Sequence, residues 1–135
     1  MKQPDEVRRD LVRQWIEKAD RDLDAAAVLA SHTPAFGGIV GFHCQQAVEK
    51  YLKALLVWHQ VELPKTHDIE RLLAGVRTVA SAVADALQET AWLTPYRVEL
   101  RYPGDLPEPR PGEEEHAIEL ARLARKVVIV ALKST

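Results

Sequence analysis

The sequence predicts an all-α fold, in which residues 1–135 form a single domain built as an antiparallel bundle of four to five helices. Alanine and leucine are abundant and aromatic residues make up only 6% of the chain, a composition that favours helices. Apolar residues recur at steps of three and four, which places them on one helical face. A chain of 135 residues is long enough to bury a core, and mostly short connections favour antiparallel neighbours.

The first helix is expected over residues 5–31. One apolar stripe runs along it, and charged residues of both signs cover the other side. A proline at position 34 ends this helix, because proline disfavours helical geometry in the residue before it. The residues of the expected stripe are Val7, Leu11, Trp15, Ala19, Leu23, Ala26 and Ala30.

The second helix, expected over residues 39–60, is apolar around most of its circumference. Such a helix is either central in the bundle or shared with a partner subunit. Its polar residues are few, and those other than Gln45 are spaced three or four apart, so they lie on one face. They are Gln46, Glu49, Lys50 and Lys53.

The second half of the chain contains two further helical regions separated by a long loop. Thr66 is the expected N-cap of a third segment, which is expected to break near Gly75, to resume, and to stop before Pro95. Residues 95–112 contain five prolines and two glycines, so we expect a long irregular loop, and long loops of this kind are often functional. The last helix is expected to begin at the acidic residues 113–115, which suit a helix N-terminus.

Composition and spacing exclude several classes of site. Cys44 is the only cysteine, so an internal disulfide and a multi-cysteine metal site are excluded. The histidines lack zinc-ligand spacing, and we expect no metal and no cofactor. A net charge of -2 gives no overall attraction for nucleic acid. We see neither a signal peptide nor a membrane span, and we expect a cytoplasmic protein.

Four groups of residues are candidates for chemistry, and each has a plainer interpretation. Cys44 is either a core residue or a nucleophile. His67 either caps a helix or donates to a phosphate at its N-terminus. Lys50 and Lys53 are either a solvated stripe or a phosphate site. Tyr96, Arg97, Arg101 and Tyr102 either clamp a phosphate and stack a base, or tie the loop to acidic helices.

Three segments together resemble the prokaryotic HEPN domain family. They are the run from Gln45 to Leu56 (QQAVEKYLKALL), Thr66-His67-Asp68-Ile69, and Arg101-Tyr102-Pro103. The likeness covers nearly the whole chain. It implies a helical bundle of the type found in substrate-binding subunits of nucleotidyltransferases, and a homodimer. It also implies a partner of the small nucleotidyltransferase fold, often in a toxin–antitoxin pair, and binding of a nucleotide or RNA.

The resemblance also implies RNA cleavage in many members, through an arginine followed by a histidine after four to six residues. No histidine lies at that distance after Arg101, and the pattern is satisfied only by Arg110 and His116. In a metal-independent ribonuclease the histidine would move the proton and the arginine would neutralise the developing oxyanion. The acids at positions 113–115 lie between the two and would repel an RNA phosphate.

Three functions therefore remain open at this point. The first is a nucleotide- or RNA-binding HEPN protein that associates with a nucleotidyltransferase partner, for which the expected ligand-binding residues are Lys50, Lys53, His67, Arg97, Arg101 and Tyr102. The second is a metal-independent endoribonuclease toxin with Arg110 and His116 as its catalytic residues. The third is a non-catalytic helical interaction module.

Overall fold

A computed structural model describes residues 3–32, 37–97 and 110–134. These ranges contain five α-helices and one 3-10 helix, so the predicted all-α bundle is confirmed. The helices are α1 (Pro4–Ala30), α2 (Gly37–Trp58), α3 (Ile69–Arg77), α4 (Ser81–Ala86), the 3-10 helix η1 (Gln88–Tyr96) and α5 (Glu113–Lys133).

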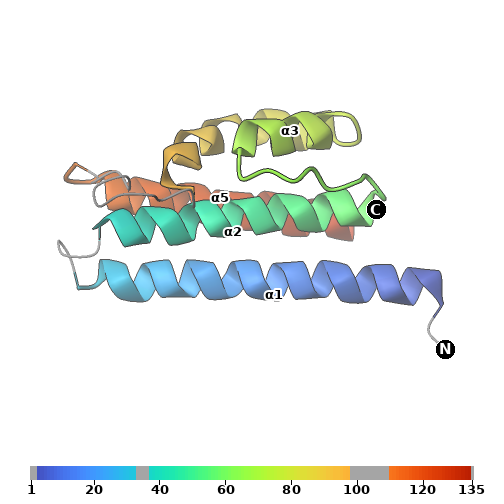
Figure 1. Cartoon of the computed structure of the whole chain (residues 1–135), viewed down its shortest axis with the longest axis horizontal. Coiled ribbons are helices and arrows are strands. Elements are labelled where there is room, and N and C mark those ends of the chain that lie inside the picture. The colour runs from blue at the N-terminus through green and yellow to red at the C-terminus, as the bar shows by residue number, and fades with distance from the viewer. Residues whose placement is uncertain (1–2, 33–36, 98–109, 135) are drawn as a thin grey trace.

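The long helices lie side by side, with α2 between α1 and the layer formed by α3 and α4 (Figure 1). Helix α1 runs antiparallel to α2, and it is also antiparallel to α5. Asp20 on α1 accepts hydrogen bonds from Tyr51 of α2 and Arg125 of α5, which ties the three helices together. Helices α3, α4 and η1 lead the chain from the end of α2 back to the start of α5, so α2 and α5 run in the same direction (Figure 1). The predicted antiparallel arrangement therefore holds for α1 with α2 and α5, but not for α2 with α5.

Helix α2 is the centre of the core, which confirms one of the two interpretations of its apolar character. Val40, Cys44, Val48, Leu52 and Leu55 are all fully buried along its length. Neighbouring helices cover it on several sides, so an apolar residue is stabilised at nearly every position.

Helix α1 buries a narrower stripe than the sequence pattern predicted. Ala19, Leu23 and Ala26 are buried as expected, but Val7 and Leu11 are each 43% exposed. The N-terminal end of α1 reaches past the end of α2 (Figure 1). Only the last turn of α2 lies beside these residues, where Val7 and Leu11 line an open hollow with Val57, so they are only partly covered.

Two predicted helix boundaries are wrong. Asp68, and not Thr66, is the N-cap of α3, because its carboxylate accepts a hydrogen bond from the backbone N–H of Glu70. Helical structure also continues past Pro95, since η1 extends to Tyr96. The expected break near Gly75 is confirmed, because α3 ends at Arg77 and α4 begins at Ser81. Of the predicted loop 95–112, residues 98–109 lie outside the described residues.

A chain of polar side chains, which we call the polar seam, lies along α2 and joins it to both neighbours. Its α2 members are His43, Gln45, Gln46, Glu49, Lys50 and Lys53, and its partners are Asp22 of α1 and His67 of the connector before α3.

On the α1 side, both oxygens of Asp22 are used. One accepts a hydrogen bond from His43 Nδ1 at 2.9 Å, and the other accepts one from the ammonium group of Lys50. The Asp22 side chain is only 15% exposed. The carboxylate is therefore largely removed from water and balanced by Lys50.

On the connector side, Glu49 has the central role. It is 2% exposed, and its Oε1 lies 2.7 Å from His67 Nδ1 and 3.5 Å from Lys53 Nζ. Gln45 donates to the backbone carbonyl of His67 at 2.9 Å. The connector is thus held to α2 through both the side chain and the backbone of one residue.

Removing the Glu49 carboxylate should destabilise the fold. We expect Glu49→Ala to lower the free energy of unfolding by about 2–3 kcal/mol, because it leaves Lys53 without its buried counter-ion and releases His67. Chemical denaturation would measure the loss. The exposed Glu62, close by in the chain, supplies a control, since Glu62→Ala should change stability by less than about 0.5 kcal/mol. Equal stability of the two variants would contradict a structural role for Glu49.

A close approach between α2 and η1 gives a second prediction. A Cβ atom at Gly41 would lie 2.4 Å from the Tyr96 ring, whereas a Cβ atom at Gly75 would lie 3.4 Å from Leu56. Gly41→Ala should therefore cost about 1–3 kcal/mol through overpacking. Gly75→Ala should be neutral or stabilising by up to about 1 kcal/mol, because alanine favours a helix interior. Thermal melting of both variants tests the contrast, and a stabilised Gly41→Ala protein would show that the contact is wrong.

Candidate functional site

The two lysines predicted to bind a ligand are already paired inside the bundle. Lys50 binds Asp22, and Lys53 lies near Glu49 with its Nζ 5.4 Å from the centre of the Trp15 ring. Their side chains are 20% and 15% exposed. The interpretation of these lysines as a solvated stripe is wrong, and a phosphate would have to compete with two carboxylates to reach them.

His67 is near Lys53 but does not cap a helix. Its imidazole and the Lys53 ammonium share the same oxygen of Glu49, and Asp68 takes the capping position. The plainer interpretation of His67 as a cap is therefore wrong. Its side chain is 43% exposed, so one edge of the ring still faces solvent.

Cys44 is a core residue, as the plainer interpretation held. It is fully buried on α2, and burial raises the pKa of its thiol to about 12. At neutral pH the side chain is thus a thiol and not a thiolate, which is the nucleophilic form.

A second polar cluster joins α1, α2 and α5. The Asp20 carboxylate accepts hydrogen bonds from Tyr51 and Arg125. Burial and this hydrogen bond raise the pKa of the Tyr51 hydroxyl, so Tyr51 stays a neutral donor. Next to the cluster, a groove of about 350 Å³ separates α1 from α5 and has Asp24 and Arg122 on its walls. The cluster is mainly a structural clamp.

The end of the bundle where α5 begins brings aromatic and basic residues together. The rings of Trp92 on η1 and His116 on α5 pack edge to face, with their centres 4.9 Å apart. Trp92 also packs near Tyr96, at 6.2 Å. Trp92 is 38% exposed, but Tyr96 is only 4% exposed against Gly41. Tyr96 therefore belongs to the core and does not stack a ligand.

Sequence reasoning did not single out Trp92. The residue lies in a short apolar run with no motif around it, and only the packing of η1 on α5 reveals its neighbour. This contact limits the orientations of the His116 ring.

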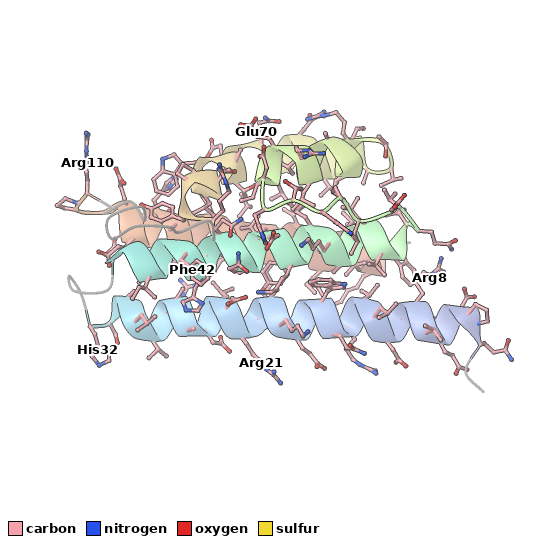
Figure 2. The ribbon with its side chains drawn as sticks, in the orientation of Figure 1. Arg8, Arg21, His32, Phe42, Glu70 and Arg110 are labelled. Carbon is pink, nitrogen blue, oxygen red and sulfur yellow. The ribbon has the colours of Figure 1, made fainter. Side chains whose placement is uncertain are left out.

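Arg110 and His116 flank the turn that starts α5. Both residues are exposed, and Gly112 between them takes a positive φ of 89°, a conformation that suits glycine. The Arg110 side chain points away from the fold (Figure 2). Within the described residues, no hydrogen bond joins Arg110 to His116, so the structure does not bring this pair into contact.

Of the remaining predicted residues, the structure describes only Arg97. Arg97 follows Tyr96 and is partly buried, and its guanidinium lies 3.5 Å from the Thr94 carbonyl oxygen. Arg101 and Tyr102 lie outside the described residues. Acidic residues 113–115 form the first turn of α5, so this end carries charges of both signs.

Two further properties of the described residues bear on the type of site. No cluster of three or more histidine, cysteine, aspartate or glutamate side chains with the geometry to hold a metal ion occurs in the described ranges. None of the helices in these ranges combines the length and apolar character that a membrane crossing requires.

Comparison with known proteins gives one relationship. No curated protein and no solved structure matches the chain. The HEPN domain family matches residues 12–134, which include α2 with its polar seam, the connector and all of α5. The chain therefore belongs to the HEPN domain family.

Proposed function

We propose that this HEPN protein binds a nucleotide or RNA at the end of the bundle where α5 begins. The observation that carries the proposal is the state of the basic side chains. In the described part of the chain, Arg110 and His116 are exposed and take part in no ion pair, whereas Lys50 and Lys53 are held by buried carboxylates. Only exposed cations are available to a phosphate without a prior rearrangement.

The chemistry of these groups fits a phosphate ligand. An arginine guanidinium donates two parallel hydrogen bonds to phosphate oxygens, and a histidine at a helix N-terminus adds a further donor. Arg97 lies on the adjoining segment, and we include it in the site. Arg101 and Tyr102 complete the proposal, the first as a phosphate ligand and the second as a stacking surface.

We also propose association with a small nucleotidyltransferase-fold protein, in a toxin–antitoxin arrangement. Support for this partner comes from the family relationship. Co-expression of the chain with a neighbouring gene of that fold, followed by copurification, would test it. Relief of growth inhibition by one of the two genes would identify which protein is the toxin.

A second candidate function is metal-independent cleavage of RNA. One observation favours it: Trp92 packs on the His116 ring and so limits the orientations of this imidazole. His116 also follows the exposed Arg110 in the sequence. The ribose 2′-OH would attack the adjacent phosphate and form a 2′,3′-cyclic phosphate, while the bond from phosphorus to the 5′-oxygen of the next nucleotide breaks. His116 would transfer a proton in this step, which removes the 2′-OH proton and leaves the departing 5′-oxygen protonated, and Arg110 would stabilise the charge on the phosphate oxygens. For this step the Arg110 side chain would have to turn toward His116.

The binding proposal predicts a loss of affinity in one variant. Arg110→Ala should weaken binding of a fluorescein-labelled single-stranded RNA about threefold to tenfold, because a charge-assisted hydrogen bond to phosphate is lost. Fluorescence anisotropy at low and moderate salt measures the change. Arg71→Ala on the exposed side of α3 is the matched control and should leave affinity unchanged. Equal affinity of both variants would remove Arg110 from the site.

The cleavage candidate is tested separately. Purified protein and its His116→Ala variant are incubated with labelled total RNA in EDTA. Cleavage by the parent alone, with at least a hundredfold loss in the variant, supports a ribonuclease. If neither protein cleaves, the ribonuclease candidate is dropped and RNA binding is then judged by the anisotropy assay. Cleavage by both proteins would point to a contaminant or to another site.

A further inference from the structure

The groove of about 350 Å³ between α1 and α5 combines charges of both signs with apolar surface. Two aspartates and two apolar residues of α1 line one wall, and two arginines of α5 line the other. The lining residues are Asp20, Leu23, Asp24, Ala27, Arg122 and Arg125. The acids of the groove therefore face its bases.

The acids and bases of the two walls follow a regular register. Helices α1 and α5 are antiparallel, and Asp20 Oδ1 accepts a hydrogen bond from Arg125 Nε at 2.9 Å. Residues three or four apart share one face of a helix. On α1, the acid one turn beyond Asp20 is Asp24. On α5, the base one turn before Arg125 is Arg122. Because the helices are antiparallel, both steps lead in the same direction, and Asp24 and Arg122 form the next opposed pair.

This second pair is open, whereas the first is closed. Within the described ranges, the side chains of Asp24 and Arg122 take part in no hydrogen bond and no ion pair, and both residues are exposed. Both line the groove. Its apolar surface comes from Leu23, which is 8% exposed, and from the small Ala27. A free carboxylate and a free guanidinium thus border one hollow that also offers apolar contact.

Both free charges act on buried groups of α2. Burial and the hydrogen bond to Asp20 raise the pKa of the Tyr51 hydroxyl, and the charge of Asp24 raises it further. Burial raises the pKa of the Cys44 thiol to about 12, and the charge of Arg122 opposes this change. Coulomb interactions weaken with distance, so the groove carries its two free charges close to the body of the bundle.

The signs of the charges restrict the kind of ligand. The lining contains two carboxylates and two guanidiniums, so its charges balance. A phosphate would be repelled by the carboxylates, and a simple amine would be repelled by the guanidiniums. A molecule with one ammonium group and one carboxylate satisfies both walls, because each group lies against the opposite charge.

We propose that this groove binds a free α-amino acid with an aliphatic side chain. The ammonium group of the ligand donates to the Asp24 carboxylate, and its carboxylate accepts hydrogen bonds from the Arg122 guanidinium. The aliphatic side chain lies against Leu23 and Ala27, which removes apolar surface from water. A volume of about 350 Å³ is at the lower end of the range for small-molecule sites, which suits a ligand of this size.

The amino-acid site is separate from the proposed phosphate site and does not depend on it. Arg110 precedes α5 and His116 lies at the start of that helix, whereas Arg122 lies further along α5 and lines the groove that it forms with α1. Binding of an amino acid between α1 and α5 therefore leaves the exposed groups at the start of α5 accessible.

Titration of the isotope-labelled full chain with L-leucine tests the site. Heteronuclear NMR spectra give the dissociation constant, and they also locate the ligand, because the largest shifts are expected for the backbone amides near Asp24 and Arg122. Isocaproic acid lacks the ammonium group of leucine, and isoamylamine lacks its carboxylate. Each should bind at least about tenfold more weakly than leucine, since each loses one charge-assisted interaction.

Two variants test the two walls separately. Asp24→Asn should weaken leucine binding about tenfold and abolish the preference for leucine over isocaproic acid. Arg122→Gln should weaken leucine binding to a similar degree and abolish the preference over isoamylamine. Glu17→Gln, at an exposed position of α1, is the matched control and should leave affinity unchanged. Thermal melting checks that every variant is folded.

Three outcomes would overturn the proposal. The first is a parent protein whose spectrum does not change with millimolar leucine, and the second is a set of shifts centred on residues outside the groove. The third is equal binding of leucine, isocaproic acid and isoamylamine, since such binding does not distinguish charge. Variants that keep the parent's preference among these compounds would remove Asp24 and Arg122 from the site.

Discussion

A nearly buried carboxylate on the central helix is the interaction on which the rest of the structure depends. Glu49 is 2% exposed, and an isolated charge at such a place would cost several kcal/mol. The fold balances it with Lys53 from the next turn and with His67 from the connector. Because His67 contacts Glu49, the connector is held at one position along α2. The start of α3, which follows His67 directly, is positioned with it. Asp22 has the same role toward α1.

The residues that stabilise the bundle and the residues that we propose bind a ligand lie in different parts of the molecule. The residues that carry the family likeness in α2, among them Gln45, Glu49 and Lys53, are largely used in contacts within the bundle. Their conspicuous pattern is explained by the need to satisfy buried polar groups. The exposed residues Arg110 and His116, where we propose that the ligand binds, lie instead at the start of α5, and Trp92 packs on the His116 ring. A change in affinity there need not be accompanied by a change in stability.

The sequence predicted the features that depend on local periodicity, and it failed where distant contacts decide. The apolar circumference of α2 predicted its central position, and residues 113–115 marked the start of α5. Thr66 and Asp68 are both suitable caps, and only the path of the connector selects Asp68. Lys50 and Lys53 looked like a solvated stripe because their carboxylate partners are identified only by the packing of α1 and the connector. Trp92 had no sequence signal, since its neighbour His116 belongs to another helix.

Helix α5 is the element in which the fold and the proposed functions meet. Its inner face includes three buried alanines, Ala117, Ala121 and Ala124. Their small side chains let the helix lie close to α2. The N-terminal turn of α5 exposes His116, with Trp92 packed on its ring, at the end of the bundle where we propose that the ligand binds.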